Sequence, residues 1–177
     1  MPVPSSSRSK SAPTSAALSV IDTLATQLAI TQRTIKRNLE GLSHEESLLR
    51  PQPGGNSANW VLGHILASRS GLLKNLGEQP LLDDAAVQQY RRGSDGNVPN
   101  PVPLAELIAA LDRSQPAIIA VMKRIPDTTL AAKSPFASPA GAEATLAEAL
   151  AAMVFHESYH VGQLGLLRRV CGKAGAI

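Results

Sequence analysis

The chain has 177 residues, which suits a single domain with a sizeable core and a short tail. Aromatic residues make up only 3% of it, so aliphatic side chains must build the core, and this favours packed helices over a β-sandwich. The formal net charge is +3, of which Arg8 and Lys10 supply two; the nearly neutral remainder argues against a nucleic-acid-binding domain. The single cysteine, Cys171, excludes an intramolecular disulfide and fits a reducing cytoplasm.

The start of the chain differs in composition from the rest. Residues 1–15 are rich in Ser and Pro and have almost nothing to bury, so they are predicted to be disordered. A helical domain is expected over residues 16–173, with a short C-terminal tail at 174–177. No apolar run approaches the roughly 20 residues that a membrane-spanning helix needs, so no membrane contact is expected.

The first long helix is predicted over residues 18–41. Apolar residues recur there at steps of three, four and seven, and the basic residues fall on the other side. Ser43 and Glu46 have the spacing of a capping box, which predicts that a short helix begins next.

A second long helix is predicted after the segment RPQPGG, which breaks the chain. Asn56 or Ser57 can cap this helix, which runs to about residue 76 and stops at Gly77. Residues 78–102 hold clusters of Pro, Gly, Asn and Asp with weak periodicity. We expect a long connection there, with one helical turn at DDAAVQQY.

Two further long helices complete the pattern. The third begins near Pro103, has an apolar stripe that continues to about residue 125, and contains Pro116, which should kink it. The last begins at a capping box of Thr145 and Glu148 and runs to about residue 171. Four long helices without a credible strand pair predict an all-α fold, a four-helix bundle with a long crossover between its second and third helices.

Three histidines on these helices suggest a metal site. His156 and His160 are four residues apart, so they share one face of the last helix, and that face is its most apolar one. His64 lies on the second helix among small residues, which include Gly63 and Gly71. If these two helices pack side by side, the three imidazoles can form a three-His site with open coordination positions, as in catalytic metal sites.

An alternative exists for each histidine taken alone. A buried imidazole more often hydrogen-bonds to a carbonyl or carboxylate and binds no metal. Because all three histidines lie on the inward faces of their helices, the metal site is favoured when they are considered together. His44 lies at a helix start beside two glutamates, and we expect it to be exposed and outside the site.

Five other residues are candidates for supporting roles. Gln163 shares the histidine face and can orient a ligand or contact substrate, although a core amide bonded to backbone fits equally well. Glu157 and Tyr159 flank this face as partners of the ligands or as ordinary rim residues. Trp60 fits a core anchor better than a wall of the substrate site. Gln115 lies on the inward stripe of the third helix and can reach the cavity.

Two segments resemble the DinB/YfiT-like family of metalloenzymes. They are SHEESLLRPQPGGNSANWVLGHI, which contains His64, and FHESYHVGQLGLLRR, which contains His156 and His160; the resemblance covers about residues 18–169. It implies an antiparallel bundle, often a homodimer, with a metal ion on these three histidines. Members with assigned activities are often thiol transferases or isomerases that use mycothiol, bacillithiol or glutathione.

The expected chemistry follows from a filled three-His site. Three neutral imidazoles leave the ion its positive charge, so a bound water or thiol is easier to deprotonate. A thiolate would give transfer to an electrophile, and a hydroxide would give hydrolysis. Zn and Ni suit the ligands best, with Fe or Mn as alternatives. We expect a cytoplasmic metal-dependent enzyme with a low-molecular-weight thiol as cosubstrate; a non-catalytic metal-binding or stress-response bundle remains the alternative.

Overall fold

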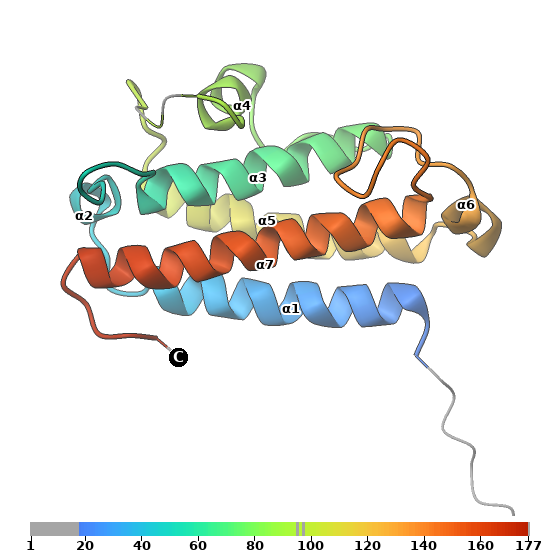
Figure 1. The fold of residues 1–177 in the computed structure, drawn as a ribbon, viewed down its shortest axis with the longest axis horizontal. Helices are drawn as coiled ribbons and strands as arrows, with labels where there is room; N and C mark the ends of the chain where they lie inside the picture. The colour runs from blue at the N-terminus through green and yellow to red at the C-terminus, as the bar shows by residue number, and fades with distance from the viewer. Residues whose placement is uncertain (1–17, 95, 97, 177) are drawn as a thin grey trace, which may run out of the picture.

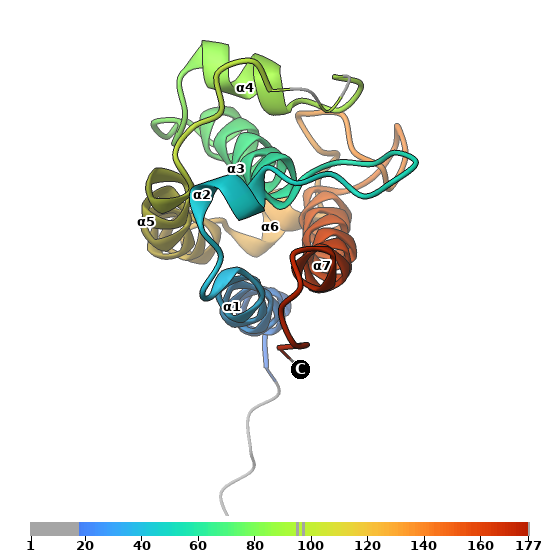
Figure 2. The ribbon, with the colours of Figure 1, turned by 90° about the vertical axis from the view of Figure 1, so that its left-hand side faces the viewer.

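The computed structural model describes residues 18–94, 96 and 98–176, and the tail predicted over residues 1–15 lies outside them. Four long helices lie side by side as a bundle, which Figure 1 shows from the side and Figure 2 from one end. The bundle is antiparallel, because two helices run in each direction. The four are α1 (Val20–Leu39), α3 (Ala58–Asn75), α5 (Leu104–Lys123) and α7 (Leu146–Val170).

The order of the helices explains the long crossover. In Figure 1, α3 and α5 run in the same direction, opposite to α1 and α7, and α3 packs against both α5 and α7. A chain that leaves the end of α3 must therefore return along the bundle before it can begin α5. The predicted crossover between the second and third long helices is confirmed.

Three short helices join the long ones: α2 (His44–Ser47), α4 (Asp84–Tyr90) and α6 (Asp127–Ala131). The helical turn expected in the crossover is α4, which has two turns and lies across the outer side of α3 (Figures 1 and 2). No pattern in the sequence predicted α6. Within the described part of the chain, no strand forms beyond an isolated bridge between Lys133 and Thr145, and no helix has the length and apolar character to cross a membrane.

Local hydrogen bonds set the helix starts as predicted. Both capping boxes form, with Ser43 and Thr145 at the N-caps of α2 and α7. Ser57, rather than Asn56, caps α3, and its hydroxyl accepts a hydrogen bond from the backbone of Trp60 at 3.2 Å. Gly77 ends α3 with a positive φ of 82°, a conformation that other residues rarely adopt.

The core is aliphatic, as the composition predicts, and α3 is its most buried helix. Neighbouring helices cover its inner side, and the crossover with α4 covers its outer side. Two large polar side chains in the middle of α3 therefore lie away from solvent: His64 is 7% exposed and Arg69 is fully buried. Such groups need partners within the protein.

Candidate metal centre

The packing of α3 against α7 brings the three predicted histidines together. The Nε2 atom of His156 lies 3.1 Å from Nε2 of His64 and 3.0 Å from Nε2 of His160. One ring nitrogen from each histidine can be chosen so that all three lie within 4.8 Å of one another. Zinc–imidazole bonds imply separations of about 2.9 Å to about 3.4 Å between neighbouring nitrogens, for bond angles from 90° to tetrahedral. The two separations from His156 fall in this range, and the 4.8 Å limit that includes the remaining pair, His64 and His160, lies above it.

The other ring nitrogens of two of the histidines are tied to oxygen acceptors. Nδ1 of His64 donates to the backbone carbonyl of Tyr90 at 2.7 Å, and Nδ1 of His160 donates to Oε1 of Gln163 at 2.7 Å. The proton of each ring is therefore on Nδ1, and the lone pair of each Nε2 points into the cluster. This is the arrangement that metal-ligating imidazoles adopt.

These lone pairs make the cluster a good fit for a cation. Nε2 of His156 faces the lone pairs of both His64 and His160. A neutral His156 carries one ring proton, so its Nε2 can donate a hydrogen bond to only one of these two neighbours. At the other contact, two nitrogen lone pairs face each other, which is repulsive. A positive ion among the three nitrogens satisfies all of them. The donor set therefore fits a divalent metal ion.

Burial keeps the three imidazoles neutral. It lowers the pKa of His156 from 6.5 to about 4, with added repulsion from charge on His160 and His64. Burial also lowers the pKa values of His64 and His160. The hydrogen bonds of these rings to Tyr90 and Gln163 raise the pKa values, but by less than burial lowers them. Neutral imidazole is the form that binds metals, so the site is ready for an ion at neutral pH.

Trp60 forms one wall of the cluster. Its indole stacks on the imidazole of His64 at a centroid distance of 4.8 Å and an interplanar angle of 11°. Its Nε1 donates to the hydroxyl of Ser94 in the crossover at 2.8 Å. The residue is 5% exposed and belongs to the core, as expected, and it also holds the plane of a candidate ligand.

Tyr90 holds the crossover against His64. Its ring packs on Gly63 so closely that a Cβ atom there would lie 2.3 Å from the ring. Its hydroxyl donates to Oδ1 of Asn59 at 2.9 Å and accepts from the backbone N–H of Val102 at 3.0 Å. Because Gly63 has no side chain, the crossover can pack closely against α3 beside His64. Tyr90 was not among the predicted site residues, although it ends the predicted helical turn and is one of only two tyrosines.

Of the two positions expected for Glu157, a partner of the ligands or a rim residue, its burial excludes the rim. It is fully buried, and both its oxygens accept hydrogen bonds from Arg69, each at 2.7 Å. Nη1 of Arg69 also donates to Ser114 at 2.6 Å and to Gln32 at 3.0 Å, so the network joins all four long helices. The segment HESYH matches the whole H-E-x-x-H pattern of zinc peptidases, but its glutamate here is bound to a guanidinium rather than placed as a base.

The remaining candidates have different surroundings. Tyr159 is 59% exposed, its ring lies against His160, and its hydroxyl accepts from Nε2 of Gln163 at 3.4 Å. Gln115 lies on α5, where both its amide atoms are buried and find no hydrogen-bond partner in the described part of the chain. His44 is half-buried rather than exposed, and its Nδ1 accepts from the backbone N–H of Leu104 at 3.3 Å.

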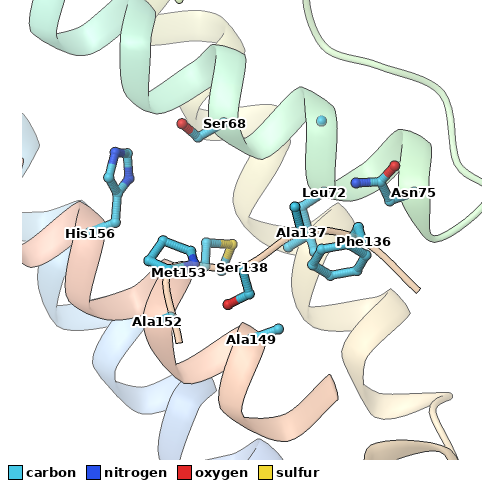
Figure 3. A pocket seen from close by; sticks show the side chains of 12 residues that line it. Ser68, Leu72, Asn75, Phe136, Ala137, Ser138, Ala149, Ala152, Met153 and His156 are labelled. Carbon is cyan, nitrogen blue, oxygen red and sulfur yellow. The ribbon is translucent and has the colours of Figure 1, made fainter. Parts of the chain in front are cut away.

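A cavity of about 270 Å³ adjoins the cluster between α3 and α7. Figure 3 shows His156 at one end of it and Phe136, from the loop before α7, toward the other. One candidate ligand thus borders a space that is large enough for a small molecule.

Comparisons with known proteins agree with this architecture. A protein-family model of the DinB superfamily matches residues 27–164, a span that includes all three histidines. Among solved structures, the chain is similar to a conserved protein from Enterococcus faecalis, at 16% identity and a TM-score of 0.71 over 89% of this chain and 100% of that one. A search of curated proteins finds no match. The structural likeness shows the fold, and the family match, which covers most of the sequence, shows that the chain belongs to the DinB superfamily.

Proposed function

We propose that the protein is a metal-dependent enzyme that carries out a transfer or isomerisation with a low-molecular-weight thiol. The observation that carries this proposal is the convergence of three Nε2 atoms, two of them with their lone pairs fixed inward by hydrogen bonds at Nδ1. His64, His156 and His160 would hold the ion. Three protein ligands leave coordination positions for a substrate atom, as in catalytic sites.

The metal ion supplies Lewis acidity, which lowers the pKa of a thiol or water bound to it. Zn and Ni suit an imidazole set best, with Fe or Mn as alternatives. The chain's own part is to keep the imidazoles neutral, oriented and shielded from water. Burial keeps the rings neutral, while the carbonyl of Tyr90 and Gln163 orient His64 and His160 by hydrogen bonds, and Trp60 covers one face of His64.

The position of Glu157 favours thiol chemistry over hydrolysis. Hydrolytic sites with the H-E-x-x-H pattern use the glutamate as a general base for water. Here both its oxygens are bonded to Arg69, so it does not fill that role. A free thiol has a pKa of about 8.5 and water about 15.7, so a thiol needs far less help to lose its proton.

The metal content of protein purified without a His tag tests the site. We expect one ion per chain, lost in His64→Ala and kept in His44→Asn, which retains an acceptor for the N–H of Leu104. Folded wild-type protein that takes up none of Zn, Ni, Fe and Mn would refute the proposal.

Thiol transfer is assayed separately with mycothiol, bacillithiol and glutathione against a general electrophile, with and without added metal. Turnover that needs both metal and His64 supports the enzyme. Bound metal without turnover by any of the three thiols supports the alternative, a non-catalytic metal-binding or stress-response bundle.

We further propose a cytoplasmic homodimer. Its support is a row of exposed apolar side chains on α7, in which Phe155 is 73% exposed, Leu166 64% and Tyr159 59%. Apolar rows of this kind are common at subunit contacts. Light scattering gives the mass in solution, and Leu166→Glu should lower it if this row is the contact.

A further inference from the structure

We infer that the cavity beside His156 binds an uncharged, mainly apolar group of the electrophilic substrate, while the charged parts of the thiol stay outside it. This inference rests on the proposed function, because it assigns the second reactant to the same site. The cavity lies between α3 and α7 and is closed on one side by the loop that contains Phe136 (Figure 3).

The walls of the cavity exclude charged groups. Its apolar lining comes chiefly from Leu72, Met153 and Phe136, and its polar side chains besides His156 are uncharged hydroxyls and an amide. Among the described residues that line it, no Asp, Glu, Lys or Arg is present. An ionised group placed there would lose its hydration without gaining a partner of opposite charge. An uncharged apolar group would lose little hydration free energy in the same place.

The size of the cavity limits its occupant. Its volume of about 270 Å³ is close to the lower end of the range for small-molecule sites, roughly 300 to 1,000 Å³. One ring or a short branched chain suits this volume. A peptide-like or sugar-like thiol carries more polar groups than these walls can satisfy.

The cavity remains open because of a small residue on α3. Gly71 lines it, and a Cβ atom at this position would have no neighbouring heavy atom within 4 Å. Glycine within a helix lowers stability relative to alanine, so helix formation alone does not favour it here. Ala149 and Ala152 line the cavity from α7. Small side chains on both helices therefore preserve a space that larger ones would fill.

The cavity is aligned with the metal centre. His156 stands at one end of it, and Ser68 lies nearby on α3 (Figure 3). The hydroxyl proton of Ser68 is donated to the backbone carbonyl of His64 at 3.0 Å, so its oxygen is left as an acceptor. A group seated in the cavity would present its near end to the histidine cluster.

Binding of benzyl alcohol tests this assignment. It is titrated into the full-length protein, in metal-loaded and metal-free forms, and followed by NMR of the backbone amides. Benzenesulfonate and benzyltrimethylammonium carry the same ring with a negative or a positive charge. We expect saturable binding of the alcohol in both forms of the protein. In the metal-free form, where no cation borders the cavity, we expect at least roughly tenfold weaker binding of either ion.

Two substitutions at Gly71 locate the binding. Gly71→Leu should weaken alcohol binding roughly tenfold or more by filling the cavity, and Gly71→Ala should have a smaller effect. Gly162→Leu is the matched control, because Gly162 is an exposed α7 residue whose Cβ position is equally free. Metal content should be the same in all of these variants.

Three results would overturn the inference: no saturable binding of the alcohol, equal binding by wild type and Gly71→Leu, or tighter binding of an ion than of the alcohol by the metal-free protein. Failure of the proposed function would look different. The wild-type protein would then take up no metal, while the cavity still bound the alcohol.

Discussion

Arg69 and Glu157 form a two-pronged ion pair in the centre of the bundle, with both nitrogen–oxygen distances at 2.7 Å and both side chains fully buried. Glu157 follows His156 directly, and Arg69 lies five residues after His64 on the facing helix. The pair therefore sets the register in which α3 and α7 present the histidines to one another.

Breaking this ion pair should destabilise the protein strongly. Glu157→Gln leaves the guanidinium buried without its counter-charge, which costs about 3–5 kcal/mol in unfolding free energy. Urea unfolding measures the change. Replacing both Arg69 and Glu157 by Met should cost much less than the two single changes together, because no charge is then left unpaired. Additive costs would contradict this account.

Gln163 should control metal affinity through His160. Gln163→Leu removes the acceptor of the Nδ1 proton, and loss of such a partner weakens metal binding roughly 10- to 100-fold. Competition with a chromophoric chelator measures the affinity. Tyr159→Phe is the control, since its hydroxyl contacts Nε2 of Gln163 rather than the oxygen that holds His160. Equal losses in the two variants would refute the role of Gln163.

Two glycines on α3 should respond in opposite directions to the same substitution. Gly63→Ala places a methyl group against the buried ring of Tyr90 and should destabilise the protein by roughly 1–3 kcal/mol. Gly71→Ala meets open space and should stabilise the helix by about 0.5–1 kcal/mol. Thermal unfolding of both variants checks the prediction, which fails if Gly63→Ala is as stable as wild type.

Metal-free protein should lose stability in mild acid. The pKa of His156 falls from 6.5 to about 4 on folding, chiefly through burial, so between these values the unfolded chain binds more protons than the folded one. The free energy of unfolding therefore decreases as the pH falls through this interval and levels off below it. Urea unfolding in the presence of a chelator, across this pH range, measures the slope. His156→Gln should flatten it, and an unchanged slope would contradict the prediction.

Local signals in the sequence predicted much of the architecture. Capping residues such as Ser57 and Thr145 act within one turn of their helix, so their effect can be read without knowing the fold. The same holds for His156 and His160, whose spacing places them on one face in any helix. The five residues of α6 are too few for a periodic pattern, and that helix was missed.

Partners that lie far apart in the sequence were harder to predict. Glu157 follows His156 by one residue, so it lies about 100° around the helix from the histidine. This spacing alone does not show which side chain on a neighbouring helix pairs with its carboxylate. Arg69, within a helix that is otherwise mostly apolar or small, was the available sign of a buried ion pair. The contact between His64 and the carbonyl of Tyr90 carried no such sign, because every residue has a carbonyl.

The hydrogen bond from His64 to Tyr90 joins the histidine cluster to the segment that covers α3. Any turn of that imidazole also withdraws a bond from the main chain of α4. Protease cleavage within the crossover should therefore be slower when the ion is bound than when a chelator has removed it. The rate of cleavage at the protein surface would then report whether the buried histidine cluster holds a metal ion.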